Sequence, residues 1–281
     1  MSERPPPEAP ATGAPWDDPV GQAPLAFVDL EMTGLDAAQD HVVEVCIERW
    51  VGSTRVGSLV SLVMPPARVG GASHVHGLDA KALASAPPFA ELAARGVELL
   101  SGAVIVAHGA KWDVSFLEAE LLRAGRPTQF PFYLDTLVLA RRSFAFRSYS
   151  LTALAKELGI SHEGAHRAEA DVAALRALFL RCIQVLAPVS VRDLWQVRIA
   201  ERRAREAILA ACDAAVEHRA EVVLTYRAAR RAPEDVIMVL TEVRRDLDPP
   251  RVMGYQLPGR GRRELRADRI LRVEPHQAAS P

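Results

Sequence analysis

The stretch FVDLEMTGLD, from Phe27 to Asp36, limits the folds open to this chain more than any other. It begins with the apolar side chains of a buried strand, yet Asp29 and Glu31 stand at alternate positions in it. Alternate residues of a strand point to the same face of the sheet, and neighbouring carboxylates there repel each other and lose water. Two explanations are open: an edge strand with one solvated face, or a site for divalent cations, which prefer carboxylate oxygen.

Alternating strand and helix signals follow this strand as far as about residue 188. Apolar runs bounded by turn residues predict strands, and apolar residues at helical spacing before a glycine predict helices. The predicted strands span residues 25–30, 41–51, 55–64, 103–107 and 132–135, and the predicted helices span residues 89–100, 113–124, 151–158 and 167–185. Three adjacent strands followed by alternating helix and strand predict an α/β domain with a mixed sheet flanked by helices.

Two later segments add carboxylates to the pair on the first strand. In VIVAHGAKWDVSFL, Asp113 stands at the start of a predicted helix, just after a buried strand. In HRAEAD, His166 precedes Asp171 by five residues at the start of the long predicted helix. A solvated loop histidine is the alternative for His166 taken alone. Four carboxylates with one histidine nearby in the sequence favour a metal site over a solvated strand.

At these residues the chain resembles the DEDDh-type 3′–5′ exonucleases, a family that includes the proofreading subunit of bacterial replicative DNA polymerase, RNase T and oligoribonuclease. The resemblance runs from Leu25 to Leu186. It rests on five segments in the family's order: DLEMTGLD, VHGL, AHGAKWDVSFL, DTLVLAR and HRAEAD. It implies a ribonuclease H-like fold, which is a five-stranded mixed sheet with helices on both sides.

The resemblance also implies a role for each matching residue. The expected ligands of two Mg²⁺ or Mn²⁺ ions are Asp29, Glu31, Asp113 and Asp171. Two such ions can activate the attacking water and stabilise the leaving oxygen of a phosphodiester. His166 is the expected general base, because histidine titrates near neutral pH. The residues expected to contact substrate are Met32, Thr33, Gly34, His76 and His108.

Two features bear on the substrate. The family's second motif usually reads His-Asn-Ala, and here Gly109 removes a side chain near the substrate. DLEMTGLD is most similar to the oligoribonuclease version of the first motif, whereas VHGL and AHGAKWD resemble the proofreading subunit. We therefore expect an enzyme that degrades single-stranded DNA or RNA from its 3′ end to nucleoside 5′-monophosphates, with DNA favoured. The alternatives are oligoribonuclease-like degradation of short RNA, and a regulator that binds nucleic-acid ends.

The arginine-rich end of the chain predicts a separate module. Residues 189–281 hold 18 arginines, no lysine and 14 acidic residues, and the planar fork of arginine suits phosphate recognition. Residues 189–219 predict a connecting helix, and residues 220–275 resemble a WYL domain through VLTYR, VMGY and RELRADRI, although the Trp-Tyr-Leu tripeptide is missing. This resemblance implies a small SH3-like β-barrel that binds a nucleotide or nucleic acid. The expected nucleic-acid contacts are Arg263, Arg266 and Arg269, with a solvated barrel surface as the alternative.

The remaining features concern the ends and the location of the chain. Residues 1–24 contain seven prolines and few large apolar side chains, which predicts a disordered tail. No apolar run approaches the ~20 residues of a membrane span, and the N-terminus lacks the pattern of a signal peptide. With three widely spaced cysteines that fit reduced thiols, these features predict a cytoplasmic protein without a membrane partner. The expected segments are 1–24, 25–188, 189–219, 220–275 and 276–281.

Overall fold

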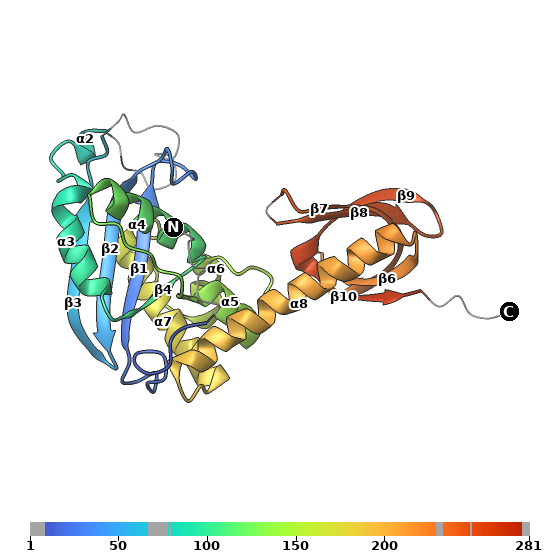
Figure 1. The fold of residues 1–281 in the computed structure, drawn as a ribbon, viewed down its shortest axis with the longest axis horizontal. Helices are drawn as coiled ribbons and strands as arrows, with labels where there is room; N and C mark the ends of the chain where they lie inside the picture. The colour runs from blue at the N-terminus through green and yellow to red at the C-terminus, as the bar shows by residue number, and fades with distance from the viewer. Residues whose placement is uncertain (1–8, 67–77, 79, 229–232, 248, 277–281) are drawn as a thin grey trace, which may run out of the picture. The chain divides into compact units, whose positions relative to one another are not determined.

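The computed structural model describes residues 9–66, 78, 80–228, 233–247 and 249–276, with the backbone alone for residue 80 and residues 198–204. The chain divides into two compact units, Met1–Arg198 and Ile199–Pro281. The division falls inside one long helix, α8 (Val191–Glu217). Each unit has its own sheet (Figure 1), so the two are described separately.

The first unit is built on a five-stranded mixed sheet with the strand order β3-β2-β1-β4-β5. β1 (Pro24–Met32) pairs antiparallel with β2 (Val42–Val51), which pairs antiparallel with β3 (Thr54–Leu62). β4 (Val104–Ala107) and β5 (Leu134–Asp135) extend the sheet on the other side of β1 in parallel. This arrangement fits the ribonuclease H-like fold that was expected from the sequence.

Helices cover both faces of this sheet (Figure 1). α3 (Phe89–Leu100) and α4 (Lys111–Arg123) pack on one face. α7 (Ala168–Leu186) packs on the other face, with α5 (Thr136–Ser143) and α6 (Leu151–Leu158) against it. A four-residue helix, α2, spans Ala80–Leu83.

The two faces of β1 carry different side chains, as the period of two in a strand requires. The even-numbered residues from Ala26 to Leu30 join the apolar core beneath α3 and α4. On the odd-numbered face, the ring of Phe27 packs edge to face against Phe179 of α7, with 5.5 Å between ring centroids. Asp29 and Glu31 continue this second face, so the strand directs both carboxylates toward the side of α7.

Residues 9–24 are packed against the first unit, so the prediction of a disordered tail is wrong for this part of it. Trp16 is buried, with its ring centroid 6.3 Å from that of Phe132, which in turn lies 6.0 Å from Trp195 of α8. Arg192 donates a hydrogen bond to the carbonyl oxygen of Pro10 at 3.0 Å. A single large aromatic residue and bonded backbone groups therefore order a segment whose composition alone indicates disorder.

The second unit is a five-stranded antiparallel sheet with the order β10-β6-β7-β8-β9. Its strands are β6 (Glu221–Tyr226), β7 (Glu234–Arg244), β8 (Arg251–Gln256), β9 (Gly261–Arg266) and β10 (Ile270–Pro275), with a 3₁₀ turn, η1, at Ala267–Arg269. A closed barrel requires its first and last strands to pair. Among the described residues no pairing joins β9 to β10, so the sheet is open and the expected closed barrel is not observed.

The last turns of α8 cover one face of this second sheet. Leu209, Cys212 and Ala215 pack with buried side chains of β6 to β9, such as Leu224 and Met238. β9 was not predicted from the sequence, because GRRELR contains one apolar residue and lies at the edge of the sheet. Among the described residues, no single helix is long and apolar enough to cross a membrane; α7 with residues 191–197 reaches that length and composition only as a pair bent by 88°.

Candidate active site

The four predicted metal ligands form one electrostatic group around Asp29. Burial raises the pKa of Asp29 well above its usual range, and repulsion from Asp113, Asp171 and Glu31 raises it further. These three neighbours come from α4, α7 and β1. The fold therefore brings together carboxylates that are up to 142 residues apart in the sequence.

Asp113 reaches this group from the first turn of α4. β4 pairs with β1 only as far as Phe27, which leaves room for Asp113 beside the last residues of β1. The backbone N–H of Leu30 donates to Oδ1 of Asp113 at 3.2 Å. Burial raises the pKa of Asp113 to about 8, although backbone hydrogen bonds act in the opposite direction.

Asp171 lies in the first turn of α7 and is held by the loop that precedes this helix. The backbone N–H of His166 donates to Oδ2 of Asp171 at 3.2 Å, and Nε2 of His162 bonds Oδ1. A ring nitrogen of His166 and carboxylate oxygens of Glu31 and Asp171 all lie within 4.8 Å of one another. His166 has a φ of 68°, a left-handed conformation that is uncommon outside glycine and that gathers at functional sites.

Excess negative charge is the main electrostatic property of this group. Burial raises the pKa of Glu31 to about 7; repulsion from Asp171 and Glu44 adds to the shift, and Arg167 opposes it. Carboxylate oxygens with one imidazole nearby are donors that suit Mg²⁺ or Mn²⁺. A divalent cation would also relieve the repulsion that raises these pKa values. The residues present therefore fit the metal site that was expected from the sequence.

Glu44 supports the group from β2, where it lies directly opposite Glu31. Its buried carboxylate accepts hydrogen bonds from Nε and Nη2 of Arg167 at 3.1 and 2.9 Å, and from the backbone N–H of Ala168 at 3.3 Å. These bonds fasten the start of α7 to β2. They thereby fix the position from which Asp171 approaches β1.

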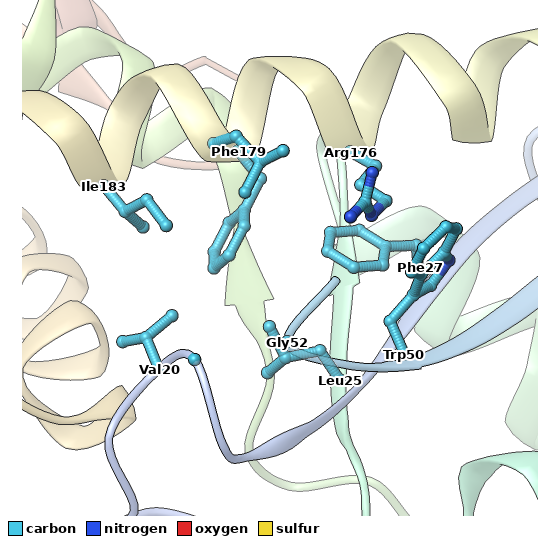
Figure 2. Close-up of a pocket in the computed structure, with 10 residues that line it drawn as sticks. Val20, Leu25, Phe27, Trp50, Gly52, Arg176, Phe179 and Ile183 are labelled. Carbon is cyan, nitrogen blue, oxygen red and sulfur yellow. The ribbon is translucent and has the colours of Figure 1, made fainter. Parts of the chain in front are cut away.

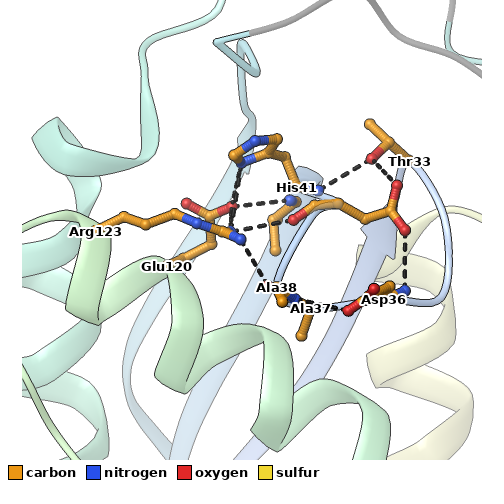
Figure 3. Close-up of polar contacts among 9 residues, drawn as sticks. Thr33, Asp36, Ala37, Ala38, His41, Glu120 and Arg123 are labelled. Carbon is orange, nitrogen blue, oxygen red and sulfur yellow. Dashed lines mark hydrogen bonds and ion pairs between the residues drawn. The ribbon is translucent and has the colours of Figure 1, made fainter.

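The loop after β1 carries three of the residues expected to contact substrate. The hydroxyl of Thr33 donates to Oδ1 of Asp40 at 3.0 Å and accepts from the backbone N–H of His41 at 3.0 Å (Figure 3). A Cβ atom at Gly34 would lie 2.3 Å from Oδ2 of Asp40, so only glycine permits this close approach. Met32, which is half-buried, packs against the core next to this turn.

Two residues of α4, Glu120 and Arg123, fasten the same loop, and we call them the α4 clamp. Oε1 of the buried Glu120 lies 3.0 Å from Nδ1 of His41 and 2.9 Å from Nη1 of Arg123 (Figure 3). Arg123 also donates to the carbonyl oxygens of Ala37 at 2.6 Å and Asp40 at 3.1 Å. The α4 clamp therefore ties the middle of the loop and its C-terminal end to the helix that carries Asp113.

His108 uses both of its ring nitrogens within the protein. Nε2 lies 2.9 Å from the carbonyl oxygen of Tyr149, which can only accept, so Nε2 carries the hydrogen. Burial lowers the pKa of His108, and its Nδ1 lies 3.0 Å from the hydroxyl oxygen of Thr136, whose hydrogen is directed to the carbonyl oxygen of Ala107 at 3.2 Å. Both ring nitrogens of His108 therefore have close partners within the protein. Its contact with substrate stays a prediction.

Gly109 explains one departure from the family pattern. Its φ is 76°, in the left-handed region that glycine and asparagine tolerate best. Its backbone N–H donates to Oδ1 of Asp135 at 2.9 Å, and the same oxygen caps α5 by accepting from Leu137. Glycine in place of the usual asparagine therefore preserves this turn.

The predicted residues that remain are His76 and the three expected nucleic-acid contacts of the second unit. His76 falls outside the described residues. Arg263 and Arg266 are three apart on β9, so their side chains leave opposite faces of the sheet. Arg266 also makes two hydrogen bonds to Asp268, at 3.0 and 2.9 Å. Because Arg269 belongs to η1, the structure does not place these arginines in one row.

A cavity of about 100 Å³ lies at the other end of β1 from the carboxylates (Figure 2). Its lining is mainly apolar and includes Leu25, Phe27 and Phe179. The guanidinium carbon of Arg176 lies 3.6 Å from the ring centroid of Trp50, an arrangement in which a cation packs on an aromatic face. None of the predicted site residues lines this cavity, and we assign it to the packing of α7 on the sheet.

Sequence reasoning missed His162 and the α4 clamp. His162 precedes Asp171 by nine residues across a loop, a spacing that no helix or strand period selects. Glu120 and Arg123 are separated by three residues on a helix, a spacing typical of a solvent-exposed ion pair. That pattern gave no sign of a loop some 80 residues earlier in the chain.

Known proteins share this fold and parts of this sequence. A DNA polymerase III subunit epsilon-like protein of Rhodobacter capsulatus is 35% identical over 177 residues, which cover 60% of this chain and 25% of that protein. The DNA polymerase III subunit epsilon of Treponema pallidum is 29% identical over 159 residues, or 55% of this chain and 74% of that protein. The chain spans 13% of the PolC-type DNA polymerase III of Thermotoga maritima, so some of these relatives are far longer.

Solved structures and a family model complete the comparison. The zinc-bound form of the E. coli ExoI–ssDNA complex superposes with a TM-score of 0.53 at 20% identity, covering 84% of this chain and 55% of that one. At this identity the likeness is one of fold. The family model RNase_T, described as an exonuclease, matches residues 26–179. Because this match covers more than half of the chain and contains all five predicted catalytic residues, the chain belongs to the RNase_T exonuclease family.

Proposed function

We propose that this chain is a metal-dependent 3′–5′ exonuclease that hydrolyses single-stranded nucleic acid, with DNA favoured, to nucleoside 5′-monophosphates. One observation carries the proposal: Asp29 lies in one electrostatic group with Glu31, Asp113 and Asp171, and His166 lies near two of these carboxylates. Buried carboxylates that repel one another oppose folding, so a chain that keeps four of them together needs a cation there.

Each residue of the group has a distinct part in this proposal. Two Mg²⁺ or Mn²⁺ ions, when bound, would supply an activated water and stabilise charge on the phosphate and the leaving oxygen. The four carboxylates would bind these ions. His166 is exposed and has a ring nitrogen near Glu31 and Asp171, so it is placed to take the proton of the attacking water and pass it to solvent.

The substrate preference rests on the relatives and on the loop after β1. Two relatives are named as DNA polymerase III epsilon-type proteins, and the ExoI structure is a complex with single-stranded DNA. Met32, Thr33 and Gly34 would contact the terminal nucleotide from a loop that the α4 clamp holds in place. A strand held only at its 3′ end is cut there first, which gives the 3′–5′ direction.

We also propose that the second unit binds a nucleotide or nucleic acid. Its arginine content supports this role, and Arg263 is exposed on β9. If Arg263 contacts a phosphate, Arg263→Ala should reduce the salt slope of binding to a 20-nucleotide strand by about one. Arg266→Ala is the matched comparison, because the bonds of Arg266 to Asp268 indicate a structural role. An unchanged slope in Arg263→Ala would remove Arg263 from the interface.

A degradation panel tests the proposed activity. Oligonucleotides labelled at the 5′ end, as single-stranded DNA, duplex DNA, single-stranded RNA and RNA of two to five nucleotides, are incubated with Mn²⁺ or with EDTA. With Mn²⁺ but not with EDTA, we expect single-stranded DNA to give a ladder of labelled fragments that shorten from the 3′ end. Chromatography of the released nucleotides should show nucleoside 5′-monophosphates. Preference for the shortest RNA would favour the oligoribonuclease-like alternative. Tight binding of 3′ ends without any hydrolysis would favour the regulator.

A further inference from the structure

A second histidine beside Asp171 is buried and incompletely bonded. The side chain of His162 is 6% exposed, and its Nε2 contacts Oδ1 of Asp171. Its other ring nitrogen, Nδ1, is buried and has no hydrogen-bond partner among the described residues. His162 thus differs from His166, whose ring is exposed and lies near Glu31.

Packing alone does not account for a histidine at this position. A buried polar atom without a partner destabilises the folded state, and a phenylalanine would fill similar space without that cost. The hydrogen bond made by Nε2 is therefore the feature of His162 that a phenylalanine could not replace. A carboxylate can only accept a hydrogen bond, so Nε2 donates to Oδ1 of Asp171 while the backbone N–H of His166 donates to Oδ2. The loop before α7 thus donates a hydrogen bond to each carboxylate oxygen of Asp171.

We propose that His162 is a positioning residue that fixes the orientation of Asp171, so that its remaining lone pairs are presented to a divalent cation together with Glu31. The inference rests on the proposed metal-dependent function. Hydrogen bonds to ligating carboxylates orient them and strengthen metal binding. The buried ring of His162 has little access to solvent, so the proton transfer assigned to His166 does not pass through it.

Three substitutions separate the hydrogen bond from the volume of the side chain. His162→Gln keeps an N–H donor near the position of Nε2. His162→Phe keeps the ring and removes the donor. His162→Asn places its amide near the position of Nδ1, too far from Asp171 to bond it. All three are compared with the full-length wild-type chain, after circular dichroism and melting temperature without metal have shown which variants fold.

The first measurement is Mn²⁺ affinity by isothermal titration calorimetry. We expect His162→Phe and His162→Asn to bind Mn²⁺ about 10- to 100-fold more weakly than wild type, the scale seen when the hydrogen-bond partner of a metal ligand is removed. His162→Gln should stay much nearer to wild type. In the hydrolysis assay at fixed Mn²⁺, kcat should fall in His162→Phe while KM for the oligonucleotide changes little, because the proposed role of Asp171 is to bind the ion and not the nucleotide.

Two results would overturn the inference. One is a folded His162→Phe or His162→Asn that binds Mn²⁺ as tightly as wild type. The other is a His162→Gln as weak as the other two variants, which would assign the effect to packing. If His162→Phe does not fold, the comparison of His162→Asn with His162→Gln decides. A wild-type chain that binds no Mn²⁺ would instead reject the proposed metal-dependent function itself, and this inference with it.

Discussion

At the residue scale, the buried carboxylate of Asp29 lowers the stability of the fold around it. It occupies the odd-numbered face of β1, where Phe27 is packed against α7, and burial raises its pKa well above the usual range. An apolar residue would suit the packing better, and a carboxylate there makes sense only with a cation to neutralise it. The site is therefore a place where stability is lost for function.

Asp29→Asn should strongly reduce hydrolysis without unfolding the chain. Loss of one charged ligand should lower kcat by about two to three orders of magnitude, the scale seen when one group that stabilises transition-state charge is removed. The melting temperature without metal should be unchanged or higher, because a source of repulsion is gone. Glu157→Gln, at an exposed position of α6, is the matched control. Wild-type activity in Asp29→Asn would reject the site.

The metal-free chain should lose stability as the pH rises from 5 to 9. The folded-state pKa values of Glu31, about 7, and Asp113, about 8, lie above the ~4 of these side chains in an unfolded chain. The folded state therefore holds more protons in this range. Their contribution to stability is fully present below about pH 4 and is lost as the pH rises through the folded-state values.

Melting temperatures measured in EDTA from pH 5 to pH 9 check this prediction. A decline is expected in EDTA, and saturating Mn²⁺ should flatten it because the cation neutralises the carboxylates. Asp29→Asn should show a shallower decline than wild type. A melting temperature that rises with pH in EDTA would contradict the assigned shifts.

At the scale of single elements, α4 has two tasks at its two ends. Its first turn presents Asp113 to the carboxylates, and its last turns hold the loop after β1 through the α4 clamp. A single rigid helix thus sets the distance between the proposed metal site and the residues expected to contact the terminal nucleotide. Changes at its C-terminal end should affect substrate binding more than chemistry.

Arg123→Ala should raise KM for a single-stranded oligonucleotide at least tenfold, because it removes two hydrogen bonds to the loop after β1 and a third to Glu120 of the clamp. Losing one hydrogen bond to a charged group costs about 1.5–3 kcal/mol, and about 1.4 kcal/mol is tenfold in affinity. We expect kcat and Mn²⁺ affinity to change little, since Asp113 lies three turns away. Arg126→Ala, at an exposed arginine three residues further, is the matched control. Equal effects of the two substitutions on KM would show that bulk charge, and not the clamp, is responsible.

For the whole molecule, the boundary between the units matters for truncation. A chain that ends at Arg198 should keep the first unit intact and hydrolyse short substrates. One that ends at Ala187 loses Val191, Leu194 and Trp195, which are buried. At about 1.5–3 kcal/mol for each fully buried apolar side chain, the shorter chain should be less stable by several kcal/mol. Melting temperatures of the two truncations test this, and equal values would contradict it.

The truncation at Arg198, compared with the full-length chain, tests the second unit. The full-length chain should bind a 20-nucleotide strand more tightly than the chain that ends at Arg198, while both cleave very short substrates at the same rate. Equal binding of the long strand would remove a nucleic-acid role from the second unit.

Local patterns in the sequence were sufficient for much of the first unit. The helices at residues 89–100 and 151–158 have the predicted bounds, because apolar spacing and end signals such as Ser150 and Gly159 act over a few residues. Short or charged elements were not predicted from the sequence. α5 depends on its cap Asp135, and β9 has only one apolar residue. The order of the tail depends on Trp16 meeting Phe132, which no local pattern contains.

The sequence by itself predicted which carboxylates to expect at the candidate site, because Asp29 and Glu31 alternate along one strand and the resemblance to the exonuclease motifs adds Asp113 and Asp171. The tertiary structure alone decided what surrounds them. It placed His162 against Asp171, and it kept β9 and β10 apart as the edges of an open sheet. Periodicity is a property of neighbours along the chain, whereas burial, charge repulsion and hydrogen-bond partners depend on residues that only the completed fold brings together.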